Sequence, residues 1–423
     1  MSKTVALHTL GCKLNFSETT AMSRMLENEG FINKNFDEVV DFYVINTCSV
    51  TDNADKECRQ LVRRIQKKAP EAMVVITGCY AQLKPEEIAS IPGVNLVLGA
   101  AEKFKISDHL KNLTKNDTGK ICSCDIEDVN IFTASYSLKE RTRIFLKVQD
   151  GCDYNCSFCT IPMARGKSRS DSIQNVLTNV EEITKDGSTK EIVLTGINLG
   201  DFGKGLHGGK KREESFWELM LALEEKAPID RIRISSIEPN LLTNEMIEMV
   251  STSKKFMPHF HIPLQSGNDE TLANMRRRYK RELYSEKVSL IKKLMPHACI
   301  GVDVITGFPG ETDDHFEDTA RFISDLDVSY LHVFTYSERD HTKALEIKPV
   351  VPMSIRNNRN KILRNISYEK MQRFTNEFIG STRKVLFEGK NKNGMMEGYT
   401  DNYIKVSTIF TPELENQIID WKI

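Results

Sequence analysis

Three cysteines near the middle of the chain have a spacing that suits iron–sulfur chemistry. Cys152, Cys156 and Cys159 form a Cys-x-x-x-Cys-x-x-Cys pattern directly after an apolar run, with no fourth cysteine nearby. Three thiolates can bind three irons of a 4Fe–4S cluster and leave the fourth iron open, which suits chemistry on a bound molecule. A structural zinc site needs a fourth ligand, which the following residues do not supply. The pattern therefore favours a catalytic cluster over zinc.

A second set of cysteines is dispersed through the N-terminal part of the chain. Cys12, Cys48 and Cys79 each follow a predicted strand. Because parallel strands place their carboxyl ends at one edge of a sheet, we expect these side chains to converge there. Buried core cysteines are the ordinary alternative, but those should lie inside a strand or on an apolar helix face, as we expect for Cys58 and Cys299. We therefore predict a second cluster site.

Small and polar residues also follow the later predicted strands. Each one alone is more often a turn residue than a ligand. In parallel sheets, however, ligands bind beyond the carboxyl ends of the strands. As a group these residues predict a cofactor site at the strand ends: Gly196, Asn198, Ser236, Glu238, Gln265, Thr306 and Gly307.

Two alternating strand–helix series must position these residues, so the fold class is α/β. The first series predicts a doubly wound α/β domain, and the second has six repeats, which predict a partial (β/α)6 barrel. The predicted strands are 5–9, 41–46, 73–77 and 94–98 in the first series and 144–149, 191–195, 231–235, 259–264, 299–306 and 330–335 in the second.

Changes in pattern predict the domain boundaries. We expect an N-terminal domain over residues 1–115, a polar linker over 116–140, the barrel over 141–372 and a small all-β module over 373–423. The linker contains Cys122 and Cys124, to which the sequence assigns no role. Short strands at 383–388, 395–399, 403–410 and 417–423 make up the all-β module.

Composition limits the classes of partner and location. No apolar run approaches the roughly 20 residues that span a bilayer, and the first residues do not resemble a signal peptide, so we expect a cytoplasmic protein without a membrane partner. The net charge of −1 does not indicate a nucleic-acid partner. Residues 356–377 hold six Lys or Arg and two Glu, which fits a solvated helix face as well as an RNA surface.

The central cysteine motif DGCDYNCSFCTIP resembles the radical S-adenosylmethionine superfamily, including the aromatic Phe158 before the third cysteine. The resemblance implies that the open iron chelates S-adenosylmethionine and that Phe158 packs near its adenine. One electron from the cluster would then produce methionine and a 5′-deoxyadenosyl radical. An electron-transfer iron–sulfur protein and a zinc-dependent RNA-binding module are the alternatives from other classes.

The order of the two cysteine sets, followed by a small β module, resembles the methylthiotransferases over essentially the whole chain. The resemblance implies that Cys12, Cys48 and Cys79 bind an auxiliary 4Fe–4S cluster where the inserted sulfur is methylated. It also implies a TRAM-like C-terminal module, here one strand short of complete. A one-electron reductant and a sulfur source must act with the enzyme, which we expect to be a monomer.

The residues around the first cysteine, LGCKLN, and the later MRRRY resemble the members that act on threonylcarbamoyladenosine in tRNA. This implies addition of a methylthio group at C2 of that nucleoside, next to the anticodon at tRNA position 37. The partner would be the anticodon stem-loop, and Arg277 is a candidate for binding the carboxylate of the modified base unless its arginine run lines an exposed helix. Isopentenyladenosine and a ribosomal-protein aspartate are the alternative substrates of the family.

Overall fold

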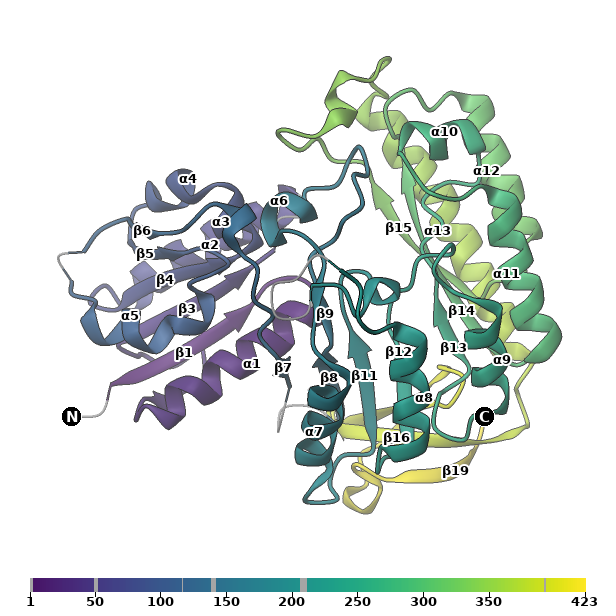
Figure 1. The fold of residues 1–423 in the computed structure, drawn as a ribbon, viewed down its shortest axis with the longest axis horizontal. Helices are drawn as coiled ribbons and strands as arrows, with labels where there is room; N and C mark the ends of the chain where they lie inside the picture. Colours follow the sequence, from purple (N-terminus) through teal and green to yellow (C-terminus); the bar gives the residue numbers. More distant parts are fainter. Residues whose placement is uncertain (1–2, 49–51, 116, 138–141, 206–210, 392) are drawn as a thin grey trace.

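The computed structural model describes residues 3–48, 52–115, 117–137, 142–205, 211–391 and 393–423. These residues form an N-terminal α/β domain, a larger central α/β domain and a C-terminal sheet, which follow one another along the chain (Figure 1). No described helix is long and apolar enough to cross a membrane.

The N-terminal domain is built on a parallel sheet, as predicted, but the sheet has six strands, of which β2 and β6 were not predicted. Its strand order is β2-β1-β3-β4-β5-β6, so β1, β3 and β4 are immediate neighbours. The bounds are β1 Thr4–Thr9, β2 Ile32–Asn33, β3 Phe42–Thr47, β4 Met73–Gly78, β5 Val94–Leu98 and β6 Lys120–Cys122.

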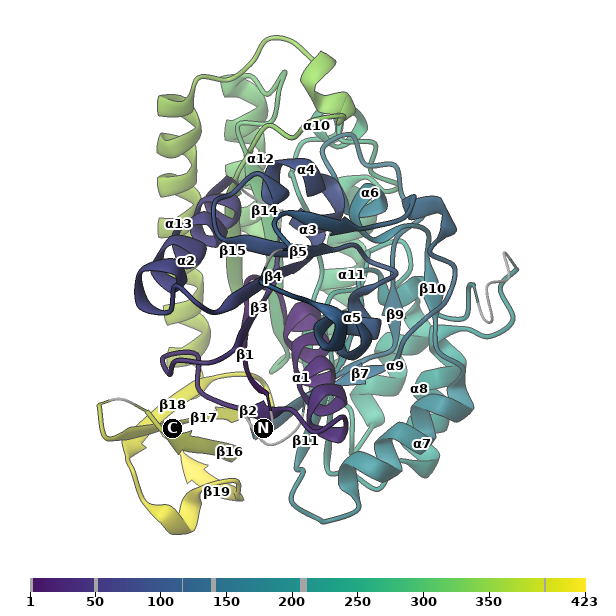
Figure 2. The same cartoon turned by 90° about the vertical axis from the view of Figure 1, so that its left-hand side faces the viewer.

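Helices cover both faces of this sheet, which confirms the doubly wound arrangement. Val44 packs with α1 and α5 in one core, whereas Ile45 packs with α2 in the other, as the period of two in a strand requires. Figure 2 shows α2 on one side of the sheet and α1 and α5 on the other. The helices are α1 Lys13–Asn28, α2 Asp52–Lys68, α3 Cys79–Leu83, α4 Pro85–Ala89 and α5 Ile106–Asn112.

The central domain contains six parallel strands in chain order. Two three-stranded sets, β8-β11-β12 and β13-β14-β15, are joined by isolated parallel bridges such as the one between Ser236 and His261. β13 is shorter than predicted, although the N–H groups of Ile262 and Leu264 still donate to the carbonyls of Gly301 and Asp303 on β14. The bounds are β8 Arg143–Lys147, β11 Glu191–Thr195, β12 Arg231–Ile234, β13 His259–His261, β14 Cys299–Thr306 and β15 Tyr330–Thr335.

The helices of the central domain enclose one large apolar core against these strands. Several of them begin at a residue whose hydroxyl accepts a hydrogen bond from a backbone N–H of the first turn, as Ser215 and Thr312 do. The helices are α6 Ile161–Arg165, α7 Ile173–Thr184, α8 Phe216–Lys226, α9 Asn244–Thr252, α10 Asp269–Asn274, α11 Arg281–Leu294, α12 Asp313–Asp325 and α13 Met353–Asn376.

The C-terminal sheet is antiparallel, with the order β18-β17-β16-β19, and it packs at the amino ends of the central strands. Arg233 of β12 donates to the carbonyls of Thr400 and Asp401 at 2.7 and 2.9 Å. The ring of His259 stacks on Tyr403 with centroids 3.9 Å apart. The bounds are β16 Thr382–Lys390, β17 Met395–Thr400, β18 Lys405–Ile409 and β19 Ile418–Lys422.

The predicted linker is more ordered than its composition indicates. It contributes β6 to the N-terminal sheet and β7 (Ser135–Tyr136), which pairs antiparallel with β8 of the central sheet. Residues 116 and 138–140 of the predicted linker lie outside the described residues. Cys122 belongs to β6, while Cys58 and Cys299 are buried in cores, as predicted.

Candidate active site

The central triplet, Cys152, Cys156 and Cys159, lies on the loop between β9 (Gln149–Asp150) and α6. The backbone N–H groups of residues 154 and 161 point at the sulfurs of Cys152 and Cys159, each at 3.4 Å. Donors of this kind stabilise thiolates, so the loop has the donor set and the hydrogen bonds that an iron–sulfur cluster needs.

Burial determines the protonation of the free thiols in this loop. It raises the pKa of both Cys152 and Cys159 to about 12, so without a metal both thiols are protonated at neutral pH. A metal ligand must be a thiolate, and cluster assembly therefore releases these protons.

Glu238, predicted for the cofactor site, and Arg277, a candidate for binding the substrate carboxylate, meet beside the central triplet. The Arg277 guanidinium donates to the sulfur of Cys156 at 3.2 Å and forms an ion pair with Glu238. Only 4% of the Arg277 side chain is exposed, which excludes the interpretation that this arginine lines a solvated helix. Arg277 follows α10, so the segment after that helix turns the side chain toward the cysteines.

The N-terminal triplet, Cys12, Cys48 and Cys79, lies at one edge of the N-terminal sheet. Cys12 precedes α1, Cys48 follows β3 and Cys79 begins α3. The three strands that lead to them are adjacent, with Thr9 opposite Asn46 and Thr47 opposite Gly78. The expected convergence at the carboxyl ends of the strands is therefore present.

Two glycines allow the loops of the N-terminal triplet to approach one another. A Cβ at Gly11 would lie 2.4 Å from the Cβ of Cys48, and one at Gly78 would lie 2.3 Å from the carbonyl oxygen of Thr47. Both glycines also have positive φ, of 99° and 100°, which other residues rarely adopt. Each glycine directly precedes a cysteine of the triplet, so the close approach and the sulfur positions depend on the same turns.

The two triplets lie next to each other across the domain boundary. α3, which begins with Cys79, packs against α6, which begins two residues after Cys159. A cavity of about 390 Å³ opens beside this contact, and Cys79 lines it together with charged side chains of both domains. The fold therefore places the two cysteine triplets side by side.

Comparison with known families agrees with this division of the chain. Residues 4–99 match a family described as "Uncharacterized protein family UPF0004", and residues 146–323 match the "Radical SAM superfamily". The first match contains the N-terminal triplet and the second contains the central triplet.

Full-length relatives decide the family. "Threonylcarbamoyladenosine tRNA methylthiotransferase MtaB" of Bacillus subtilis is 36% identical over 99% of this chain and 93% of its own length. The chain belongs to the radical S-adenosylmethionine methylthiotransferases. The protein of the same name from Aquifex aeolicus is also 36% identical, over 95% and 96% of the two lengths. A "tRNA-2-methylthio-N(6)-dimethylallyladenosine synthase" of Clostridium botulinum is 30% identical over 92% and 86%.

A methylthiotransferase of this family is an enzyme that transfers sulfur-containing groups, and its radical domain implies S-adenosylmethionine and a 4Fe–4S cluster. A solved structure shares the fold: the radical S-adenosylmethionine methyltransferase TsrM from Kitasatospora setae. It is 14% identical, with a TM-score of 0.58 over 81% of this chain and 77% of that one.

In this methylthiotransferase, Gly196 and Asn198 lie on the turn after β11. The side-chain oxygen of Gln149 accepts hydrogen bonds from the N–H groups of Ile197 and Asn198 at 2.9 and 2.8 Å, which fixes that turn. The buried Asn198 donates to Asp201, and its Oδ1 has no partner among the described residues. An unpaired buried acceptor is consistent with a ligand at this position. Sequence reasoning missed Gln149, although a polar residue at the end of an apolar strand was a signal.

Phe158 lies in an aromatic patch beside the central triplet. Its ring centroid is 6.2 Å from that of Phe308, in an edge-on arrangement. The neighbouring Ser157 is tied by its backbone to Met275 and Ala344. The loop that carries the cysteines is thus anchored to the segments after α10 and β15.

Gln265 has a backbone conformation that is uncommon for its residue type. Its φ is +67°, and its N–H donates to the carbonyl of Asp303 at 2.8 Å. Backbone strain of this kind is concentrated at ligand sites. Ser236, which also follows a strand, is fixed by the bridge with His261.

Thr306 and Gly307 have partners within the protein. The buried Thr306 hydroxyl lies 3.3 Å from the carbonyl of Phe334, and the N–H of Gly307 donates to the carboxylate of Glu311 at 3.1 Å. A Cβ at Gly307 would lie 2.2 Å from the Cγ of Arg356. These contacts shape the turn after β14, and the predicted cofactor role of both residues stays a prediction.

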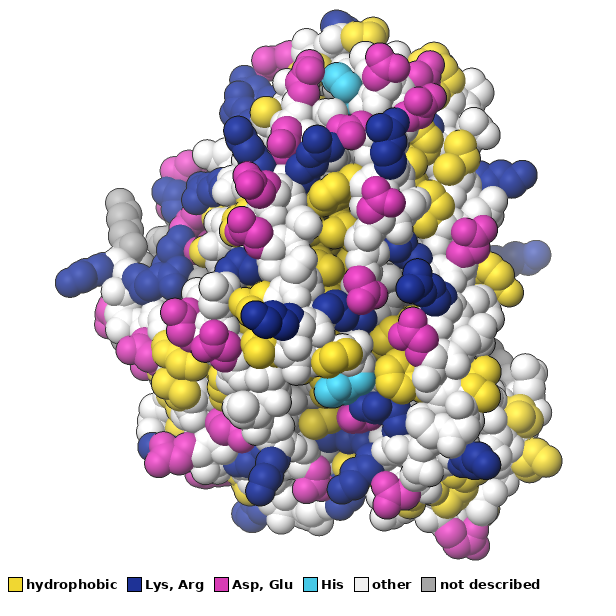
Figure 3. Space-filling view, turned by 90° about the vertical axis from the view of Figure 1, so that its right-hand side faces the viewer, with side chains coloured by type: hydrophobic (Ala, Val, Ile, Leu, Met, Phe, Trp, Pro, Cys, Tyr) yellow, Lys and Arg dark blue, Asp and Glu magenta, His cyan; other side chains and the backbone are white. Residues whose placement is uncertain are grey.

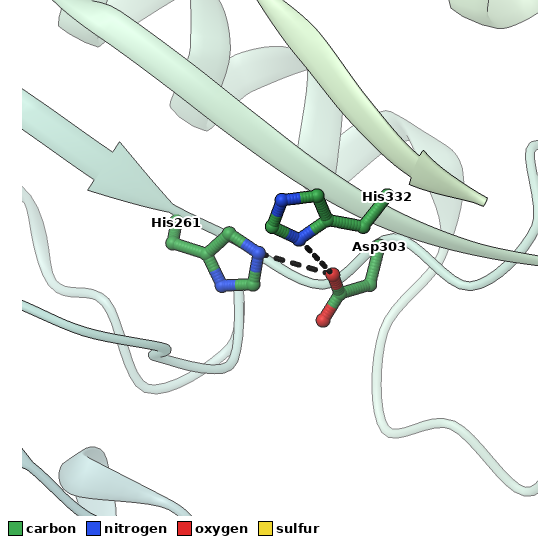
Figure 4. A group of neighbouring side chains, drawn as sticks. All are labelled: His261, Asp303 and His332. Carbon is green, nitrogen blue, oxygen red and sulfur yellow. Dashed lines mark hydrogen bonds and ion pairs between the residues drawn. The ribbon is translucent and has the colours of Figure 1, made fainter. Parts of the chain in front are cut away.

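A third polar group lies on three neighbouring strands and was missed by sequence reasoning. Asp303 of β14 accepts hydrogen bonds from His261 and His332 at 3.0 and 3.3 Å (Figure 4). Burial raises the pKa of Asp303, but the hydrogen bonds and charges of His261 and His332 have a larger, opposite effect. The pKa of Asp303 therefore lies well below its ordinary value. Val302 and Val304 face the helices, so Asp303 points to the other side of the sheet, away from them.

Proposed function

We propose that this protein adds a methylthio group at C2 of N6-threonylcarbamoyladenosine in tRNA, next to the anticodon. The observation that carries the proposal is the contact between α3 and α6, because it brings the N-terminal triplet close to the central triplet, and we assign sulfur insertion to the first and radical generation to the second. A 5′-deoxyadenosyl radical is short-lived, so the two sites must act on one substrate atom at close range.

In this proposal Cys152, Cys156 and Cys159 bind the cluster that, when present, supplies the electron for cleavage of S-adenosylmethionine. Asn198 and Gln265 bind that cofactor at the strand ends. The ion pair of Arg277 with Glu238 supports this assignment, because it fixes a guanidinium against the sulfur of Cys156. Arg277 therefore acts at the S-adenosylmethionine site beside Cys156, and it does not bind the carboxylate of the modified base, contrary to what the sequence had suggested.

Cys12, Cys48 and Cys79 bind the auxiliary 4Fe–4S cluster in this proposal. The fit rests on three thiols that follow neighbouring strands at one edge of the sheet. When bound, this cluster carries the sulfur that is methylated and inserted. A sulfur source and a one-electron reductant complete the reaction.

The substrate is inferred from relatives and from local sequence. Two proteins named as threonylcarbamoyladenosine tRNA methylthiotransferases are 36% identical to this chain over nearly its full length, against 30% for a dimethylallyladenosine synthase. The sequence LGCKLN around Cys12 points the same way. A single-stranded anticodon-loop base can be splayed into a site at modest cost.

The remaining assignments follow from this reaction. We propose residues 1–115 as the auxiliary-cluster domain, 141–372 as the radical domain and 373–423 as a TRAM-like module that contributes to RNA binding. The enzyme would act as a cytoplasmic monomer.

The deciding assay gives the reconstituted enzyme two anticodon stem-loops, one with threonylcarbamoyladenosine and one with isopentenyladenosine. We expect a methylthio adduct, detected by mass spectrometry, on the first RNA only. An unmodified stem-loop is the control. An adduct only on the isopentenyl RNA would refute the proposed substrate and leave the radical chemistry intact.

A further inference from the structure

A group of buried charges joins the two cysteine triplets. We call it the interdomain charge cluster; each of its side chains is at most 8% exposed, and it consists of Glu18, Lys103, Lys147, Asp150, Arg165 and Arg169. Glu18 and Lys103 come from the N-terminal domain, and the others come from the central domain. Burying this many charges is unfavourable unless each is paired, so the arrangement needs a physical reason.

Arg165 is the centre of this cluster. Its Nη1 lies 3.1 Å from Glu18 Oε1 and 2.9 Å from Asp150 Oδ1, and its Nη2 lies 2.5 Å from Asn15 Oδ1. Asn15 in turn donates to the carbonyls of Leu10 and Thr47, on the chain segments just before the first two cysteines of the N-terminal triplet. The last residue of α6 is therefore bonded to the framework of the N-terminal cysteines.

The charges of the cluster do not balance. Four cations face two carboxylates, so the cations outnumber the anions by two. Lys103 and Lys147 both bind Glu18, at 2.7 and 3.3 Å, and thus share one carboxylate. Burial lowers the pKa of Lys147 although Glu18 and Asp150 oppose it, as expected for a cation that lacks enough negative charge around it.

The excess positive charge faces the N-terminal cysteines. The cavity of about 390 Å³ is lined by Cys79 and by every member of the interdomain charge cluster. The Arg165 guanidinium lines this cavity together with Cys79, and through Asn15 it is bonded to the segments just before Cys12 and Cys48. An iron–sulfur cluster bound by three thiolates is an anion, and its reduction potential depends on nearby charge.

We propose that Arg165 is a positioning residue for the auxiliary cluster, supplied by the radical domain. Its guanidinium is held by Glu18 and Asp150 beside the N-terminal cysteines, where it compensates the negative charge of the cluster and of the sulfur bound to it. The same contacts fix α6, and with it the central triplet, at a set distance. This inference rests on the proposed auxiliary cluster, which iron analysis of the central-triplet variant tests separately.

The test is a redox titration of the reconstituted enzyme followed by electron paramagnetic resonance. A variant with Cys152, Cys156 and Cys159 replaced by Ala lacks the central cluster, so its titration curve (here called the auxiliary wave) belongs to the auxiliary cluster alone. We expect Arg165→Gln to shift that wave to a more negative potential, because a nearby cation favours the reduced cluster. Arg165→Lys keeps the positive charge and should therefore have a potential close to that of the wild type. The potential of the central cluster should not change in either variant.

A matched control removes a buried arginine elsewhere: Arg233→Gln, whose partner is Glu191 at the amino end of the central strands. It should leave the auxiliary wave unmoved. An unchanged auxiliary potential in Arg165→Gln with full iron content would overturn the proposal. If Arg165→Gln loses the iron of the auxiliary cluster, its iron content is compared with that of Arg165→Lys. About four more irons in the Lys variant than in the Gln variant would support a role for the charge, and an equal loss in both would refute it.

Discussion

At the level of single residues, the backbone beside the cysteines of both triplets helps to determine where the sulfurs lie. Gly11 and Gly78 precede two cysteines of the N-terminal triplet and adopt backbone conformations that other residues rarely take. In the central triplet, backbone N–H groups point at two of the sulfurs. Cysteine spacing thus supplies ligands, and the neighbouring turns decide where those ligands lie.

The first prediction concerns iron content. Because the triplets lie on separate domains, the reconstituted wild-type enzyme should hold about eight irons, and replacing Cys152, Cys156 and Cys159 by Ala should leave about four. Iron and acid-labile sulfide analysis under anaerobic conditions measures both values. Loss of all iron in this variant would show that the N-terminal triplet does not bind a cluster by itself.

The second prediction separates the roles of the triplets. Replacing Cys12, Cys48 and Cys79 by Ala leaves the central site complete, so the variant should still cleave S-adenosylmethionine to 5′-deoxyadenosine under reducing conditions. It should form no methylthio product on the RNA. Chromatography of the nucleosides and mass spectrometry of the RNA give the two readouts. A wild-type yield of product would exclude the auxiliary cluster from the reaction.

At the level of elements, charged side chains make several of the contacts that join the sheets and helices. The C-terminal sheet is held by Arg231 and Arg233, which donate to backbone carbonyls of β16, β17 and the turn after β17. Arg233 also binds the fully buried Glu191 at 2.9 Å. The sheet is therefore fixed to the amino ends of the central strands, at the end opposite to the central triplet.

The third prediction tests this docking. Arg233→Ala should destabilise the protein by about 3–5 kcal/mol, because Glu191 stays buried and loses its 2.9 Å partner, while its ion pair with Arg231 is 3.8 Å long. Denaturation monitored by circular dichroism gives the change, and hydrogen exchange should show lost protection in β16 and β17. The control is Lys405→Ala, which removes an exposed pair with Glu397 and should cost about 0–1 kcal/mol. Equal costs in the two variants would contradict the docking role.

At the level of the whole molecule, the surface charge bears on where RNA could bind. On the face shown in Figure 3, basic and acidic side chains are interspersed, in keeping with the net charge of −1. The basic stretch at 356–377 forms most of α13, but two of its arginines are structural: Arg356 binds Glu338 and Arg359 binds Glu311, both from buried positions. Lys361, Arg364 and Arg373 remain exposed on the helix.

The fourth prediction concerns RNA binding by this helix. Replacing Lys361, Arg364 and Arg373 by Gln should weaken binding of the anticodon stem-loop and flatten the dependence of log K on log salt by about one unit for each lost phosphate contact. Cleavage of S-adenosylmethionine should be unchanged, since no residue of the cysteine sites is altered. Fluorescence anisotropy at several salt concentrations measures the slope. An unchanged affinity and slope would place the RNA on another surface.

The sequence by itself determined the features that depend on neighbouring residues. The period of the apolar residues located the four main N-terminal strands and the six central strands, because strand formation and burial leave a local pattern. The spacing of Cys152, Cys156 and Cys159 indicated their chemistry because all three lie on one loop. Register with the strand ends was enough to expect Cys12, Cys48 and Cys79 at one edge, since parallel strands share their direction.

Only the tertiary structure decided which distant side chains meet. Arg165 lies near the N-terminal cysteines through the packing of α6 on α3, and Asp303 joins two histidines from separate strands, so neither group leaves a signal in sequence spacing. The polar linker became two edge strands because unpaired edges of both sheets were available to it. Arg277 is buried because the chain after α10 turns inward. Three consecutive arginines in the sequence do not indicate which of them is buried. Burial and pairing of charges depend on the whole fold, and local pattern carries no record of them.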